Sequence, residues 1–125
     1  MSQKVEVRSG TSTSDYLSKL DVALQVARGS FDPELVVYNA GTDILDGDPL
    51  GCLRISPDGV INRDEKVFAF AREKKVPLVM LTSGGYMKSS AQVIADSILN
   101  LSKKQLIDVR DRTIQNVSGG KHSVL

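Results

Sequence analysis

The sequence predicts a three-layer α/β/α protein in which a parallel sheet lies between helices. Two apolar runs indicate strands that are covered on both faces, because neither run alternates with polar residues: LVVYNA at residues 35–40 and VPLVMLT at residues 76–82. Stretches with helical periodicity stand before, between and after these runs. Strands that alternate with helices are typical of a parallel sheet with helices packed on its faces.

The first 30 residues predict a short strand and a helix. KVEVR, at residues 4–8, is a candidate strand, and the polar segment SGTSTSD after it supplies several candidate N-caps. Apolar residues then recur at helical spacing, and Gly29 fits the end of the helix. These apolar residues are Tyr16, Leu17, Leu20, Ala23, Leu24 and Ala27.

Two more helices are predicted further along the chain. NRDEKVFAFAREKK indicates a helix that begins near Asn62, because acids stand in its first turn and lysines in its last. A third helix follows Tyr86, with Ser89 or Ser90 as its cap. Its apolar face consists of Ala91, Ile94, Ala95, Ile98 and Leu101. The pattern then weakens, so we predict a domain at residues 1–102 and a loosely ordered tail at residues 103–125.

Composition favours one ordinary intracellular domain. The chain has 125 residues, 41% hydrophobic and 25% charged. Its 16 basic and 15 acidic residues nearly cancel and form no strong basic cluster, so we expect neither nucleic acid nor a membrane as a direct partner. The single cysteine, Cys52, excludes an internal disulfide and is expected to be a small, partly buried residue. No signal peptide or membrane-spanning apolar run is present.

Two loops follow the carboxyl ends of the predicted strands. GTDILDGDPLG carries three carboxylates, Asp43, Asp46 and Asp48, and SGGY occupies residues 83–86. Ligands of open parallel sheets bind outside these strand ends. If the two strands are neighbours, both loops therefore face one crevice.

Each loop allows a chemical and a structural interpretation. Asp43 follows its strand directly, where a rigid backbone can fix an oxygen ligand for a divalent metal. The Tyr86 hydroxyl stands beside two glycines and could donate to a developing oxyanion. Judged singly, each loop is better explained as structural, with acids and glycines capping a turn and Tyr86 packing on it. SGGY also lacks the lysine and the spacing of a phosphate-binding P-loop.

The two loops together, in this order, resemble a known family. YNAGTDILDGDPLG followed by LVMLTSGGY is similar to the C-terminal part of the zinc-dependent histone deacetylases. The details GTDILDGDPLG, ISPDG and TSGGYMKSSAQVIADSILNL resemble the class IV branch, especially its plant members. The resemblance runs from about Lys4 to Leu101.

This resemblance implies a partial arginase/deacetylase fold and a role for several residues. It implies that Asp43 is the second carboxylate ligand of a catalytic zinc ion and that Tyr86 polarises the acyl-lysine carbonyl. Gly84 and Gly85 would line the channel that admits the acyl-lysine side chain, and Leu50 would line its mouth. In this family zinc activates the water that attacks the amide. The implied substrate is an acyl-lysine protein such as a histone, and the implied compartment is the nucleus or the cytoplasm, with a role in chromatin regulation.

The chain departs from the family in most of the metal site. Family members also hold zinc through an Asp-x-His pair, and a His-His pair serves as general base and acid. This chain has neither, and its one histidine, His122, stands in the predicted tail. Because a catalytic zinc uses three protein ligands, we expect a truncated deacetylase chain with an incomplete zinc site, inactive on its own.

Other partners and functions follow from this incompleteness. An unpaired sheet edge would favour pairing with another deacetylase chain, by complementation or by interference. The alternative hypothesis is a non-catalytic binding or interfering module, whose crevice holds an acidic or acyl ligand without chemistry. A different α/β hydrolase acting through Asp43 ranks third, because Ser83 has no histidine to activate it.

Overall fold

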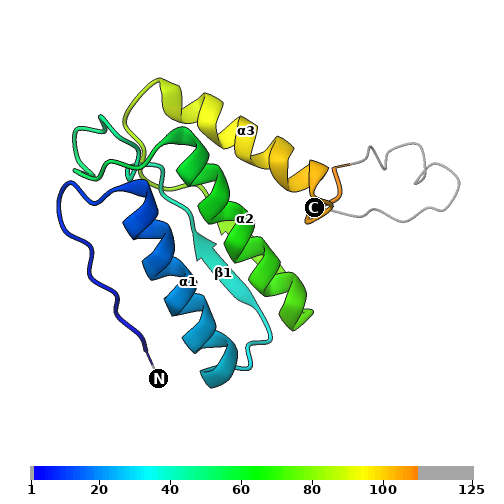
Figure 1. The fold of residues 1–125 in the computed structure, drawn as a ribbon. Helices are drawn as coiled ribbons and strands as arrows, with labels where there is room; N and C mark the ends of the chain where they lie inside the picture. The colour runs from blue at the N-terminus through cyan, green and yellow to red at the C-terminus, as the bar shows by residue number, and fades with distance from the viewer. Residues whose placement is uncertain (1, 110–125) are drawn as a thin grey trace, which may run out of the picture.

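The computed structural model describes residues 2–109, and its helices and strands alternate along the chain (Figure 1). The elements are α1 (Thr13–Ser30), β1 (Val36–Asn39), α2 (Pro57–Lys74), β2 (Leu78–Leu81) and α3 (Ser89–Lys103). His122 and most of the predicted tail lie outside the described residues. The predicted alternation of helices and strands is confirmed.

The two strands pair with each other in parallel. Val36 lies opposite Leu78, and Tyr38 lies opposite Met80. The chain crosses from one strand to the next through α2, as a parallel pair requires. Parallel neighbours end at the same edge of a sheet, so the loops that follow β1 and β2 start side by side.

The helices form one layer, in which α2 packs between α1 and α3 (Figure 1). The strands face this layer with alternate side chains: Tyr38 donates a hydrogen bond to Asp64 of α2, whereas Val37 is exposed. Burial alternates in both strands. The expectation that both faces of the strands are covered is therefore not met within residues 2–109.

The start of α2 differs from the prediction. The helix begins at Pro57, whereas the sequence pattern placed its start near Asn62. Ser56 is the N-cap, and its Oγ accepts a hydrogen bond from the Gly59 N–H at 3.0 Å. Proline fits the first helical position, because the N–H that it lacks would have no partner there. The Ser-Pro pair in ISPDG indicates this helix start, but the prediction relied on the charged residues after Asn62 instead.

The predicted strand at residues 4–8 is wrong. This segment has no assigned secondary structure and no strand beside it among the described residues, and one segment alone cannot form a ladder. Lys19 of α1 donates instead to the Glu6 carbonyl at 2.8 Å. Val5 and Val7 line a shallow apolar groove beside α1. The segment therefore lies along the helix rather than in the sheet.

A hydrophobic core cluster includes one residue of the loop GTDILDGDPLG at residues 41–51, which we call the acidic loop. It consists of Leu45 from that loop, Ile55 before α2, Val60 in α2 and Val93 in α3. Because these elements share one core, the loop is anchored to two helices. Cys52, expected to be partly buried, is exposed, and its backbone has a left-handed φ of 57°. Among the described residues, no helix combines the length and apolar character needed to cross a bilayer.

Candidate functional site

The loops after β1 and β2 are joined directly. The Thr42 N–H donates to the Gly84 carbonyl at 2.6 Å, and Thr42 Oγ1 donates to the same oxygen at 3.2 Å. The Ala40 N–H donates to the Leu81 carbonyl at 2.8 Å, which continues the pairing of the strands. Thr42 is buried, so water does not compete for these bonds. The strands are neighbours, as the expectation of a shared crevice required, and the two loops meet at one edge of the sheet.

Asp48 ties the loops together a second time. Its Oδ1 accepts hydrogen bonds from the Leu50 N–H at 2.9 Å and the Gly51 N–H at 3.1 Å. Its Oδ2 accepts from the Tyr86 N–H at 2.9 Å. Burial by itself would raise the pKa of Asp48, but the three N–H donors outweigh it and hold the pKa below its ordinary value. Asp48 is thus an ionised clamp whose two oxygens are already in use.

Sequence reasoning missed this role for Asp48. A signal was present, because an aspartate often accepts a hydrogen bond from the N–H two residues further on and so forms an Asx turn. DGDPLG has the composition of such a turn. The bond to Tyr86 has no counterpart in the local sequence, because it crosses 38 positions.

Asp43 lies between two glycines. A Cβ on Gly41 would come within 2.7 Å of Asp43 Oδ1, and a Cβ on Gly84 would overlap Asp43 Oδ2. The carboxylate therefore keeps its place only because both neighbours lack a side chain. Asp43 is half-buried, and within residues 2–109 its carboxylate has no hydrogen bond or ion pair. It is available to a ligand, unlike the carboxylate of Asp48.

Tyr86 combines a fixed backbone with a free phenol. Its N–H is held by Asp48, whereas its side chain is 57% exposed and its hydroxyl has no acceptor in the described part of the chain. Gly85 precedes it with φ of 144°, a conformation that favours glycine, and packs against Thr42. Leu50 is exposed, and its N–H donates to the same Asp48 carboxylate that accepts from the Tyr86 N–H. Asp48 thus holds the backbones of Leu50 and Tyr86, whereas Asp43 lies beside Gly84 and Gly85 lies beside Thr42.

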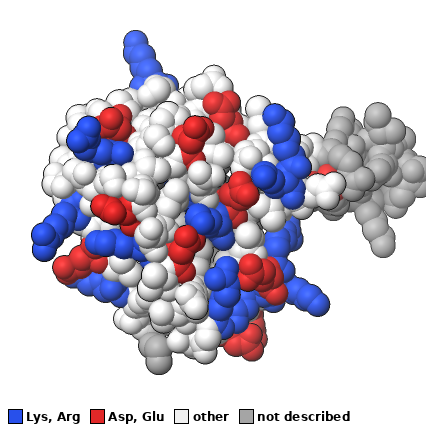
Figure 2. Space-filling model, viewed as in Figure 1, with Lys and Arg blue, Asp and Glu red and all other residues white. Residues whose placement is uncertain are grey.

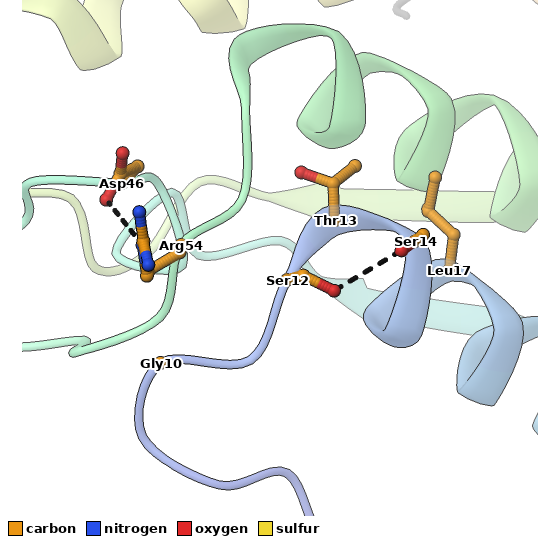
Figure 3. A pocket seen from close by; sticks show the side chains of 7 residues that line it. All are labelled: Gly10, Ser12, Thr13, Ser14, Leu17, Asp46 and Arg54. Carbon is orange, nitrogen blue, oxygen red and sulfur yellow. Dashed lines mark hydrogen bonds and ion pairs between the residues drawn. The ribbon is translucent and has the colours of Figure 1, made fainter.

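Asp46 has a different environment. It is exposed, and its Oδ1 lies 4.0 Å from Arg54 Nε at a shallow groove of about 670 Å³ beside the start of α1 (Figure 3). Figure 3 shows the other lining residues, which are Gly10, Ser12, Thr13, Ser14 and Leu17. Such an exposed, loosely spaced ion pair contributes little to stability. The three carboxylates of the loop therefore have three different environments.

A zinc ion does not fit the residues that the structure describes. Catalytic zinc sites use three protein ligands and keep a position for water. Among residues 2–109, no three His, Cys, Asp or Glu side chains lie close enough together to hold one ion. Asp43 is a single free carboxylate, and Asp48 is committed to backbone donors. Further ligands are needed before a metal could be held here.

A buried polar network lies below the acidic loop. Asp64 of α2 is 1% exposed and accepts from Tyr38 Oη at 2.5 Å, from Ser97 Oγ at 2.6 Å and from Arg63 Nε at 2.9 Å. Arg63 Nη2 also lies 2.9 Å from Asp64 Oδ1, as an ion-pair contact without hydrogen-bond geometry. Arg63 Nη1 donates to the Gly41 carbonyl at 2.5 Å. The network therefore links β1, α2 and α3 to Gly41, which stands two residues before Asp43.

Burial and charge set the protonation of this network. Burial raises the pKa of Tyr38 far above its ordinary value; Arg63 opposes the rise and Asp64 adds to it. Burial by itself would lower the pKa of Arg63, but Tyr38 and Asp64 more than offset this and raise it. Tyr38 is therefore a neutral donor and Arg63 a permanent cation. Sequence reasoning missed the network, although helical spacing from the apolar Val60 and Val67 puts positions 63 and 64 on the buried face.

Comparisons with known proteins agree on the kind of domain. Residues 1–102 match the family model described as histone deacetylase domain. Histone deacetylase 2 of Arabidopsis thaliana is 75% identical over 108 residues, which are 86% of this chain and 28% of that protein. The chain therefore spans little more than a quarter of the length of this relative.

Two solved structures are similar in shape. The crystal structure of an acetylpolyamine aminohydrolase from Burkholderia pseudomallei superposes with a TM-score of 0.65 and 25% identity, over 76% of this chain and 26% of that one. The HD domain of HDA15 superposes with a TM-score of 0.62 and 29% identity, over 80% of this chain and 28% of that one. Both similarities include most of the described residues.

Proposed function

Because this chain belongs to the histone deacetylase family, we propose that it forms one wall of a zinc-dependent site that deacetylates acyl-lysine. Both solved neighbours have the deacetylase fold, so the predicted partial α/β arginase/deacetylase fold is confirmed. The observation that supports the proposal most directly is the hydrogen bond from the Thr42 N–H to the Gly84 carbonyl at 2.6 Å. It holds the loop of Asp43 against the loop of Tyr86.

In this proposal Asp43 is a carboxylate ligand of the zinc ion, one of the three protein ligands that such an ion needs. Its half-buried carboxylate has no other partner among residues 2–109. Tyr86 donates its phenolic hydrogen to the acyl carbonyl, whose oxygen gains charge as the amide is attacked. Because Asp48 holds its backbone, this donor needs little reorganisation.

The remaining loop residues shape access for the substrate. Gly84 and Gly85 add no side chains beside Asp43 and Tyr86, which leaves room for the slender acyl-lysine side chain. Leu50, 66% exposed on the same clamp, would contact the substrate at the mouth of the channel. The substrate is an acyl-lysine protein such as a histone, in line with the name of the 75% identical relative. We propose that the chain belongs to the class IV branch. We also propose that it takes part in chromatin regulation and acts in the nucleus or the cytoplasm.

The isolated chain is proposed to be inactive. Asp43 alone cannot hold zinc. General acid–base catalysis needs a positioned proton carrier, most often histidine, and residues 2–109 contain none. The same observations favour a second candidate, a non-catalytic module that binds or interferes with another deacetylase. In that case the chain binds acyl-lysine or a protein partner without turnover.

Zinc content and hydrolysis of an acetyl-lysine peptide test the inactivity. We expect the purified chain to contain far less than stoichiometric zinc by elemental analysis and to hydrolyse nothing. Asp43→Ala is the test variant, and Asp46→Ala, which removes an exposed carboxylate of the same loop, is its control. Stoichiometric zinc that only Asp43→Ala removes, with hydrolysis that Tyr86→Phe abolishes, would show that the chain is an enzyme by itself. Peptide binding without hydrolysis would favour the binding module.

The roles of Asp43 and Tyr86 are tested in a completed domain. Residues 1–102 replace the matching segment of the Arabidopsis relative. We expect this chimera to deacetylate, Asp43→Ala to lose its zinc, and Tyr86→Phe to keep zinc while its kcat falls. An active chimera whose zinc content is indifferent to Asp43→Ala would refute the ligand role.

A further inference from the structure

One peptide unit of the acidic loop is held at both of its polar atoms. The carbonyl of Gly41 and the N–H of Thr42 belong to the same planar group. The carbonyl accepts a hydrogen bond from Arg63 Nη1 of α2 at 2.5 Å, and the N–H donates to the Gly84 carbonyl at 2.6 Å. Because the group is rigid, these two bonds together fix its orientation. Asp43 is the next residue along the chain.

The sheet does not supply the bond that Arg63 makes. β1 ends at Asn39, and the pairing of the strands extends one residue further, through the bond from the Ala40 N–H to the Leu81 carbonyl at 2.8 Å. Gly41 lies beyond that bond. A backbone carbonyl that has left its ladder and is shielded from water needs another donor. The guanidinium from α2 is that donor for Gly41.

Gly41 also lies against the Asp43 carboxylate. A Cβ on Gly41 would come within 2.7 Å of Asp43 Oδ1, and a Cβ on Gly84 would overlap Asp43 Oδ2. The first of these glycines carries the held carbonyl, and the second accepts the bond from the held N–H. A shift of the peptide unit would therefore move the contacts on both sides of the carboxylate.

The guanidinium that holds Gly41 is itself fixed. Arg63 Nε donates to Asp64 Oδ1 at 2.9 Å, and the guanidinium carbon lies 5.6 Å from the centre of the Tyr38 ring. Asp64 in turn accepts from Tyr38 Oη at 2.5 Å and from Ser97 Oγ at 2.6 Å. A guanidinium offers its donors in one rigid plane, whereas a lysine ammonium is a compact point charge on a flexible stem.

Stability alone is a weak reason for burying this ion pair. Figure 2 shows Lys and Arg interspersed with Asp and Glu over the face of the molecule in view, whereas Arg63 and Asp64 are 4% and 1% exposed. Their attraction must offset the cost of removing two charges from water, and well-packed apolar residues are often as stable at such a place. What the pair adds is a fixed geometry, and one end of that geometry is the Gly41 carbonyl.

We propose that Arg63 is a positioning residue for Asp43: it holds the Gly41–Thr42 peptide so that the Asp43 carboxylate keeps one orientation at the end of β1. Arg63 acts through the backbone of Gly41 and takes no part in the chemistry itself. This inference rests on the proposed function for what the carboxylate binds, but not for the bond that orients it.

Hydrogen exchange of single amides in the full 125-residue chain, followed by NMR, tests the role of Arg63. Arg63→Lys keeps the positive charge but not the fork of donors. Because a hydrogen bond to a charged group is lost, exchange of the Thr42 amide should become about 10- to 100-fold faster. The amide of Ala40 should change much less, because only a general weakening of the fold speeds both amides alike.

Ser97→Ala is the control for loss of stability. It removes a buried donor to Asp64 but leaves both hydrogen bonds of Arg63 in place. We expect this variant to unfold more readily and to show no selective effect on the Thr42 amide. A selective effect as large as that of Arg63→Lys would overturn the specific role of Arg63.

Arg28→Lys is the control for the chemical change. It replaces a guanidinium in an exposed pair with Glu73 and should alter neither amide. Equal acceleration of the Thr42 and Ala40 amides by Arg63→Lys would mean that Arg63 only stabilises the fold. No acceleration of the Thr42 amide would likewise overturn the inference.

The completed domain gives a second readout, and it also serves if Arg63→Lys does not fold in the isolated chain. In the chimera that contains residues 1–102, Arg63→Lys should weaken zinc binding about 10- to 100-fold, the usual cost of changing a residue that orients a metal ligand. Competition with a chelating dye measures this affinity, and amide exchange is repeated on the same variant.

The outcomes distinguish this inference from the proposed function. A Thr42 amide that depends on Arg63, in a chimera whose zinc content does not depend on Asp43, would support the orienting bond and count against the proposed function. Zinc that depends on Asp43 but is bound equally tightly by Arg63→Lys would overturn the positioning role and leave the proposed function intact.

Discussion

The carboxylate of Asp48 accepts a hydrogen bond from the backbone N–H of Tyr86 at 2.9 Å, across 38 positions of sequence. The other oxygen of the same carboxylate holds the N–H groups of Leu50 and Gly51. One buried side chain therefore fixes the backbone under the proposed phenolic donor and the turn of the acidic loop. The side chain of Tyr86 is exposed, and its hydroxyl has no hydrogen-bond partner among residues 2–109.

The clamp predicts a dependence of stability on pH. The pKa of Asp48 is held below its ordinary value, since the N–H donors outweigh the effect of burial. Its ionisation therefore stabilises the fold above the ordinary aspartate pKa of about 3.9, and this contribution is lost as the pH falls through the lower folded value. We expect the free energy of unfolding to decline less steeply below about pH 4 in Asp48→Asn than in the unmodified chain. Urea denaturation at several pH values measures this, with Asp46→Asn as the control for net charge, and equal slopes would contradict it.

The buried ion pair predicts a large effect of one neutralising substitution. Asp64→Asn leaves the charge of Arg63 buried and uncompensated, which we expect to cost about 3–5 kcal/mol of unfolding free energy. The control is Glu73→Gln in the exposed pair with Arg28, where the expected loss is about 0–1 kcal/mol. Chemical denaturation compares the two variants. A small and equal loss in both would mean that the network does not stabilise the fold.

Two glycines, one in the loop after β2 and one in α1, predict opposite effects of substitution by alanine. At Gly85, φ is 144° and a new Cβ would meet Thr42 Oγ1 at 2.6 Å, so Gly85→Ala should destabilise the fold by about 1–3 kcal/mol. Gly29 lies in α1 with nothing within 4 Å of a new Cβ, so Gly29→Ala should stabilise it by up to about 1 kcal/mol. Thermal and urea unfolding give the signs directly. A gain from Gly85→Ala would exclude the close contact with Thr42.

The free phenol predicts a separation of stability from activity. Because no described residue accepts from the Tyr86 hydroxyl, Tyr86→Phe should change the free energy of unfolding by less than about 0.5 kcal/mol. In the active chimera the same change should lower kcat by about 10²–10³, the usual cost of removing an oxyanion donor. Unfolding experiments and steady-state kinetics on the same variant decide the point. A marked loss of stability would assign Tyr86 a structural role instead.

Local pattern was sufficient for the main elements. The apolar runs around Val36–Asn39 and Leu78–Leu81 are strands, and the periodic segments are helices, because side-chain spacing alone determines which surfaces can be buried. The Ser56-Pro57 pair also indicates the early start of α2, because serine is a favoured N-cap and proline fits the first helical position. The candidate strand at residues 4–8 failed for another reason, since a strand depends on a neighbour that its own sequence does not specify.

The sequence by itself determined the α/β alternation, the family and the identity of the loop residues that could act. Only the tertiary structure decided which carboxylate is free within residues 2–109: Asp43 and Asp48 are chemically identical, but N–H donors occupy Asp48 and leave Asp43 without a partner there. It likewise decided that Arg63 and Asp64 form a buried network and that, in the described part of the chain, Val37 is exposed. These outcomes depend on hydrogen bonds and contacts between residues far apart along the chain, which periodicity and composition do not encode.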